Sequence, residues 1–250
     1  MNEKISAVVQ CICKLPYAKV HPNETYAQLS LLGINDVKHP KDLYQYDPAL
    51  LSKYAKTFVE KERIKLAGIA FSTGIPGGPV SITGGVLLDI EEYVRRIFIL
   101  AQKVGHTFGI IPIPFVKSIP AKIEDYFDSV HEEILKAVLL GFGTAGISMG
   151  IAQFSKFLAE KEVKEIIQRK ISDKAITELS KHVAKVIGKE VTKKSISRTT
   201  GRIIPIVGGA INATFAYYAL RKIGDNLVNN MMKEHIEVKR NVIYYWEEEK

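Results

Sequence analysis

Three long stretches without a charged residue constrain how this chain can fold. They run from Leu66 to Leu88, from Ala137 to Phe154 and from Ile203 to Leu220, in a 250-residue chain of which 25% is charged. Eighteen helical residues span about 27 Å, close to the thickness of a bilayer's hydrocarbon core. The last two stretches therefore have the length of either a buried core helix or a membrane segment.

Glycines inside these stretches favour close packing of helices. The segment GRIIPIVGGAINATF places Gly208 in a glycine pair, and GISMG places Gly146 and Gly150 at the G-x-x-x-G spacing that lets two helices approach closely. Pro205 and Asn212 weaken an independent membrane-insertion signal. We expect glycine-rich helical hairpins that pair with each other, either inside a bundle or inserted shallowly in a bilayer, with Asn212 hydrogen-bonding inside the pair.

Helix start and stop signals predict an all-α protein without a substantial β-sheet. A segment beginning after His21 ends at Gly33, and Asp47 caps the next helix, which extends to about Phe71. A further helix is expected to stop at Gly105. The apolar residues that indicate the capped helix are Leu50, Leu51, Tyr54, Phe58, Ile64 and Leu66.

The pattern predicts one helical bundle and no second domain. We assign residues 1–237 to it, with N-terminal helices in 1–60 and a glycine-rich core in 61–237. A final helix is expected from Ile203 to Glu237. The segment VKRNVIYYWEEEK, residues 238–250, is interpreted as a C-terminal tail.

The net charge of +8 comes almost entirely from residues 156–202, which we call the basic segment. It holds 13 of the 35 Lys and Arg residues and 6 of the 27 Asp and Glu residues. Its apolar residues recur at helical spacing, and between Phe157 and Arg202 it has no aromatic residue that could stack on bases, so nucleic acid is not expected. An anionic membrane surface or a membrane protein is the expected partner, and the solvated face of a core helix is the alternative. The lysines expected to bind are Lys181, Lys185, Lys189, Lys193 and Lys194.

Two weak patterns suggest chemistry. Ser148 lies in GISMG, which fits the G-x-S-x-G nucleophile motif, but its context is helical and the same glycines fit a helix-packing face. Asp89 with Arg95, Arg96 or Arg202 could form a buried polar site, although a carboxylate at a helix start is also favoured by the helix dipole. The histidines are scattered, so no metal site and no cofactor are predicted.

Two blocks resemble the EcsC protein family, a group of mostly bacterial helical proteins. They are GIPGGPVSITGGVLLDIEEYVRRIFILAQKVG and GRIIPIVGGAINATFAYYALRKIGDNL, about a quarter of the chain. The matching positions are Gly77, Asp89, Gly105, Gly201, Arg202, Pro205, Gly208 and Asn212. The resemblance implies a helical fold and membrane association, and it assigns no reaction.

The expected function is therefore a non-enzymatic, membrane-associated helical protein, with pore formation as a variant. The alternative is a hydrolase acting on a lipid or membrane-derived substrate. Cys11 and Cys13 are too close together for a disulfide framework, and the start of the chain has no signal-peptide cleavage pattern. We expect a cytoplasmic protein, peripheral to or shallowly inserted at the inner face of the cell membrane, and an oligomer is compatible with the glycine faces.

Overall fold

The computed structural model describes residues 18–73, 85–110 and 205–248, together with 134, 137–141, 177–178 and 181. These residues form helices and contain no strand, which confirms the predicted all-α class. The elements are α2 (Pro22–Ser30), the 3-10 helix η2 (Pro40–Gln45), α3 (Pro48–Thr73), α4 (Gly85–Thr107) and α8 (Pro205–Glu248).

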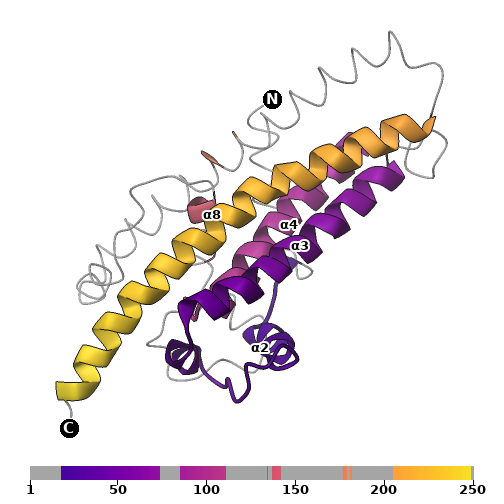
Figure 1. Cartoon of the computed structure of the whole chain (residues 1–250). Helices are drawn as coiled ribbons and strands as arrows, with labels where there is room; N and C mark the ends of the chain where they lie inside the picture. The colour runs from indigo at the N-terminus through magenta and orange to yellow at the C-terminus, as the bar shows by residue number, and fades with distance from the viewer. Residues whose placement is uncertain are drawn as a thin grey trace.

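Three long helices lie side by side and make up the body of the bundle (Figure 1). The most extensive packing is between α3 and α8, α4 packs against both, and α2 packs against α4. Lys239 Nζ donates to the Tyr46 carbonyl just before α3, whereas Arg63 Nε, further along α3, donates to the Tyr217 carbonyl. The helices α3 and α8 are therefore antiparallel.

The helix starts agree with the sequence signals. Asp47 Oδ1 accepts a hydrogen bond of 2.8 Å from the Ala49 N–H, so Asp47 caps α3 as predicted. His21 Nδ1 accepts from the Asn23 N–H at 3.2 Å in the same way at the start of α2. A proline in the first turn fits both helices because its missing N–H would be unpaired there in any case.

Two helices end in the same glycine-dependent motif. Beyond α2, Gly33 has φ +96°, its N–H donates to the Ser30 carbonyl, and the Ile34 N–H donates to the Leu29 carbonyl. These two bonds define a Schellman motif, in which the residue after the helix needs a positive φ that glycine adopts easily. The predicted stop at Gly33 is confirmed.

The end of α4 corrects the stop predicted at Gly105. Gly105 is buried inside the helix, and α4 continues to Thr107. The residue with positive φ is Gly109, at +66°; its N–H donates to the His106 carbonyl, and the Ile110 N–H donates back to the Gly105 carbonyl. Gly105 therefore contributes a carbonyl to the Schellman motif that Gly109 makes possible.

The last helix is longer than predicted. Residues up to Glu248, which the sequence assigned to a tail from 238, continue α8. No glycine or proline follows Gly224, so the chain contains no strong helix breaker there. Val238 is buried, so the boundary placed after Glu237 falls inside a packed helix.

The core lies among α3, α4 and α8, with η2 and α2 covering one end. The largest fully buried side chains are Phe58, Phe98, Phe108, Leu29, Ile34, Leu43, Leu51, Ile97 and Leu100. Of the apolar residues that indicated α3 in the sequence, Leu51, Phe58 and Leu66 are buried, whereas Ile64 is exposed.

Two glycines allow another segment of the chain to pack closely against α8: Gly141, which contacts α8 from outside, and Gly224 of α8 itself. A Cβ on Gly141 would lie 2.9 Å from Leu227 Cγ, and Asn226 Nδ2 donates to the Gly141 carbonyl at 3.1 Å. A Cβ on Gly224 would lie 3.0 Å from Val59 Cγ2 and closer still to Val59 Cγ1. Glycine thus allows close approach at these sites, as the sequence indicated for Gly141.

Replacement of Gly224 by alanine is expected to destabilise the protein by up to about 2 kcal/mol. Overpacking against the stiff side chain of Val59 costs about 1–3 kcal/mol, which exceeds the helix-propensity gain of about 1 kcal/mol. Urea unfolding followed by circular dichroism measures the change. The double variant Gly224→Ala/Val59→Ala should lose less than the sum of the two single variants. A Gly224→Ala variant more stable than the wild type would contradict the close contact.

Candidate functional site

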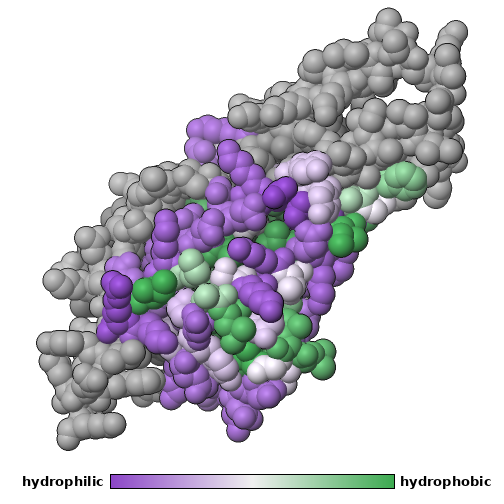
Figure 2. Space-filling view, in the orientation of Figure 1, coloured by the Kyte–Doolittle hydropathy of each residue, from purple (hydrophilic) through white to green (hydrophobic). Residues whose placement is uncertain are grey.

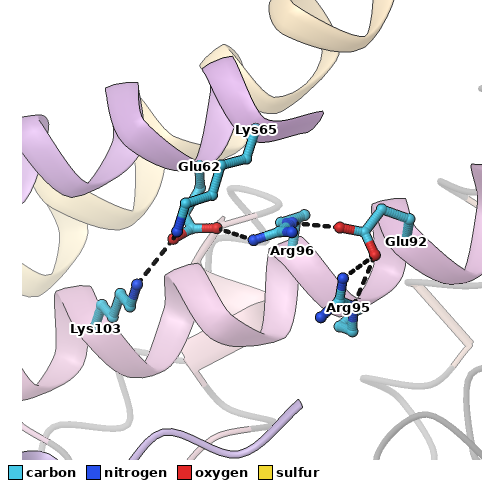
Figure 3. Close-up of polar contacts among 6 residues, drawn as sticks. All are labelled: Glu62, Lys65, Glu92, Arg95, Arg96 and Lys103. Atoms are coloured by element: carbon cyan, nitrogen blue, oxygen red, sulfur yellow. Dashed lines mark hydrogen bonds and ion pairs between the residues drawn. The ribbon is translucent and has the colours of Figure 1, made fainter. Parts of the chain in front are cut away.

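A network of charged side chains joins α3 to α4 (Figure 3). Glu62 of α3 lies at its centre with a fully buried side chain. Its Oε2 accepts a hydrogen bond of 2.7 Å from Arg96 Nη1, and its Oε1 accepts one of 2.8 Å from Lys103 Nζ. Lys65 Nζ, one helical turn along α3, is 3.3 Å from Oε1. Both oxygens of this buried carboxylate are thus bonded to cations.

Glu92 extends the network along α4. Its Oε1 accepts from Arg96 Nε at 2.5 Å, and its Oε2 accepts from Arg95 Nε at 2.7 Å and also pairs with Arg95 Nη2. Arg96 therefore bridges two carboxylates, Glu62 from α3 and Glu92 from its own helix. The fixed fork of donors on a guanidinium suits such a bridge better than the single ammonium of lysine.

The network keeps its members charged. Burial alone would raise the pKa of Glu62, but hydrogen bonds and positive charges from Lys103, Arg96 and Lys65 outweigh it and lower this pKa below its ordinary value. Burial would likewise lower the pKa of Arg96, but Glu62 and Glu92 raise it overall. At neutral pH Glu62 is therefore an ionised acceptor with its oxygens in use, and it cannot serve as a general acid. The geometry suits holding two helices in a fixed register.

A second contact joins α3 to α8 on the other side. Arg63 Nη1 donates to Glu60 Oε2 at 2.7 Å, and the Tyr217 hydroxyl donates to Glu60 Oε1 at 2.6 Å. The Arg63 guanidinium carbon is 3.7 Å from the centroid of the Tyr217 ring, a cation–π contact. Two adjacent residues, Glu62 and Arg63, thus fix the rotation of α3 against both neighbouring helices.

A polar cluster lies at the end of the bundle that η2 covers. His235 of α8 is fully buried, and its ring stacks on Tyr44 of η2 with centroids 4.8 Å apart. Its Nδ1 donates to the Phe108 carbonyl at 2.7 Å, and the Tyr44 hydroxyl donates to the Gly109 carbonyl at 3.0 Å. The carbonyls that follow α4 are therefore bonded from both η2 and α8.

The buried histidines are neutral at physiological pH. Burial, with a smaller contribution from His21, lowers the pKa of His106 to about 3. The Nδ1 atom of His106 is 3.2 Å from Thr25 Oγ1. Burial also lowers the pKa of His235, and the positive charge of Lys239 lowers it further. These effects outweigh the hydrogen bond to the Phe108 carbonyl, which raises this pKa. Since His235 Nδ1 carries the proton, Nε2 is an acceptor, and within the described residues it forms no hydrogen bond. No three His, Cys, Asp or Glu side chains in this part of the chain group together as metal ligands would.

Few of the predicted site residues fall where their contacts can be described. Arg95 and Arg96 meet in the charged network. Lys181 is exposed and pairs with Glu178 at 3.0 Å. The backbones of Asp89, Gly208 and Asn212 are helical, but their side-chain positions lie outside the description. The predicted residues outside the described ranges are Ser148, Arg202, Lys185, Lys189, Lys193, Lys194, Gly77, Gly146, Gly150 and Gly201.

The sequence analysis did not single out Glu62, Glu92 or Lys103 of the network. Glu62 is four residues after Phe58 and four before Leu66, both buried, so a carboxylate stood on an apolar helix face. Such a charge needs a buried partner, which was the available signal. Lys103 gave no comparable sign, because its partner is on another helix.

No family model, curated protein or solved structure matches the chain. Among the described helices, none has the length and apolar character that crossing a bilayer requires. Together, the fold and the site define an all-α bundle that is held by a buried ion-pair network. The resemblance to the EcsC family stays a hypothesis that rests on the two sequence blocks.

Proposed function

We propose that the chain is a non-enzymatic helical protein of the EcsC type that binds an anionic membrane surface. The observation that carries the proposal is the uneven charge. Outside the basic segment the chain has 22 basic and 21 acidic residues, because 13 of 35 and 6 of 27 lie inside it. A nearly neutral body with one strongly cationic segment suits an acidic partner, and an anionic lipid surface attracts such a segment.

The charges of the bundle support this division. Arg96 and Lys103 are bonded to the buried Glu62, and Arg63 is bonded to Glu60, so these cations serve the fold. The basic segment then supplies the excess charge that a partner would meet.

The uncharged stretches support a membrane partner in particular. The end of α3 and the beginnings of α4 and α8 lie at the same end of the bundle (Figure 1). Two of the three uncharged stretches, Leu66–Leu88 and Ile203–Leu220, contribute to those helix ends. The parts of α3 and α8 at this end carry no charge, and neither do the first four residues of α4, which suits contact with lipid.

Flotation with liposomes tests the proposal. The protein is expected to float with vesicles containing phosphatidylserine, not with neutral ones, and to be released at 1 M salt, where the screening length is about 3 Å. Reversing Lys185, Lys189 and Lys193 to glutamate should weaken binding at least tenfold, because each basic residue near an anionic surface contributes about 1 kcal/mol.

The control for that variant reverses Lys38, Lys41 and Lys53, which are exposed on the bundle, and so changes the net charge equally. We expect a much smaller effect from it. Equal losses would mean that only net charge matters, and absence of wild-type binding to anionic vesicles would overturn the proposal. Dye release from the same vesicles would identify the pore-forming variant.

A further inference from the structure

The outer face of α3 carries apolar side chains in its C-terminal half. Ile64 is 58% exposed and Phe71 is 39% exposed. Gly68 lies between them, and a Cβ built on it would meet nothing within 4 Å. Positions i, i+4 and i+7 share one helix face, so these three residues form a continuous strip, the α3 stripe.

The α3 stripe cannot turn inward. Glu62 is bonded to Arg96 and Lys103 of α4, and the neighbouring Arg63 contacts Tyr217 of α8. These contacts fix the rotation of α3, and Ile64 follows them on the side that faces neither helix. The exposure is therefore a property of how the bundle is assembled.

The surroundings of the stripe have the chemistry of a membrane interface. Lys61 and Lys65 are exposed on α3 within a turn of Ile64, and Tyr218 of α8 is exposed beside Tyr217. Lysine extends its charge toward lipid phosphates while its stem stays on apolar surface, and tyrosine is enriched at the headgroup level. Figure 2 shows hydrophobic residues where α3 ends, at the upper right, next to hydrophilic ones, and a second group lower, around α2.

We propose that the α3 stripe is the surface through which the bundle docks on an anionic bilayer. Ile64 and Phe71 enter the boundary between headgroups and acyl chains, and Lys61 contacts phosphates. Charge complementarity favours this occupant, since Lys61 is an exposed cation bordering the stripe, whereas the carboxylate of Glu60, one turn before Ile64, is paired with Arg63. Continuity also favours it, because α3 runs from the stripe into a stretch that holds no charged residue up to Leu88. This proposal rests on the proposed function and assigns the orientation of the bundle on the membrane.

Leu31 offers a matched comparison at the opposite end of the bundle. It is 87% exposed, and the next residue, Leu32, accepts a hydrogen bond from Tyr54 in the first part of α3. Ile64→Ser and Leu31→Ser each remove one exposed aliphatic side chain. Because neither side chain is in the core, both variants should keep the wild-type urea midpoint.

The test measures vesicle partitioning of these variants. Ile64→Ser should weaken binding to phosphatidylserine vesicles about threefold or more, Ile64→Ser/Phe71→Ser at least tenfold, and Leu31→Ser less than twofold. Depth is measured independently with Phe71→Trp and Leu31→Trp, each combined with Trp246→Phe because Trp246 is the single natural tryptophan. Fluorescence of the tryptophan at position 71 should shift to the blue and be quenched by brominated lipid, while that at 31 should stay unchanged.

The outcomes separate the two proposals. A wild-type protein that does not bind vesicles overturns the proposed function and the docking surface together. Wild-type binding with no effect of Ile64→Ser/Phe71→Ser, or with quenching at 31 and not at 71, overturns the docking surface alone. Self-association seen by sedimentation that Ile64→Ser abolishes, with vesicle binding unchanged, would assign the stripe to a second copy of the chain.

Discussion

Replacement of Glu62 by glutamine is expected to lower the free energy of unfolding by about 3–5 kcal/mol, the usual cost of removing one partner from a buried ion pair. Glutamine keeps the size of the side chain but removes the negative charge. Arg96 would keep Glu92, whereas Lys103 would lose the carboxylate that it binds at 2.8 Å. Most of the loss thus comes from cations left partly buried without compensation.

Urea unfolding followed by circular dichroism measures this loss, and Glu60→Gln is its control. Glu60 also pairs with an arginine on α3, but its side chain is 44% exposed. The Arg63 side chain is 9% exposed, but water reaches the Glu60 carboxylate and screens the pair, so the control should lose less than Glu62→Gln. Similar losses in both variants would contradict the larger cost that we expect for breaking the buried network.

The pH dependence of stability gives a second measure of the same network. The pKa of Glu62 is lowered by folding, so its stabilisation is present above its ordinary pKa of 4.5 and is lost as the pH falls through the folded value. His106, lowered from 6.5 to about 3, resists protonation in the folded state and begins to reduce stability below pH 6.5. Glu62→Gln should therefore keep the decline that begins near pH 6.5 and lose the additional decline below pH 4.5.

Local signals allowed the predictions that succeeded. The Asp47 cap and the stop at Gly33 depend on hydrogen bonds to residues at most five positions away. The error at Gly105 has the same local origin: two glycines, Gly105 and Gly109, stand four residues apart at the end of α4, and only backbone φ distinguishes Gly109, the one that ends the helix. The predicted end of α8 at Glu237 was too early, because the sequence contains no glycine or proline after Gly224 that would stop the helix.

The site depended on contacts that the sequence does not place. Glu62 reaches Arg96 and Lys103, which are 34 and 41 residues away. Arg95 and Arg96 could be singled out, but their carboxylate partners could not be chosen without the packing of α3 on α4. Ile64 belongs to the apolar pattern of α3 and is nevertheless exposed, because periodicity indicates a helix without fixing how that helix is rotated against its neighbours.

The inward network and the outward stripe are two consequences of one helix rotation. Glu62 and Arg63 occupy the inward side of α3 because each has a partner on a neighbouring helix. Ile64 and Lys65 then follow on the outward side. Loss of the network in Glu62→Gln would relax this rotation, so the vesicle binding that we propose for the α3 stripe should weaken in this variant.

Replacement of Gly109 by alanine is expected to cost about 3 kcal/mol, from a left-handed backbone worth about 1–2 kcal/mol and overpacking worth about 1–3 kcal/mol. The added Cβ would lie 2.6 Å from the carbonyl oxygen of Pro40, a backbone atom at the start of η2. That segment is held in place because the Tyr44 hydroxyl of η2 donates to the carbonyl of Gly109 itself.

Gly33→Ala is the matched control, because Gly33 ends α2 in the same Schellman motif with φ +96°. A Cβ there would meet nothing within 4 Å, so only the backbone term of about 1–2 kcal/mol remains. Urea midpoints of the two variants give the difference directly. A larger loss at Gly109 would locate a rigid contact between η2 and the end of α4, whereas equal losses would mean that η2 moves aside and that φ alone requires glycine at both helix ends.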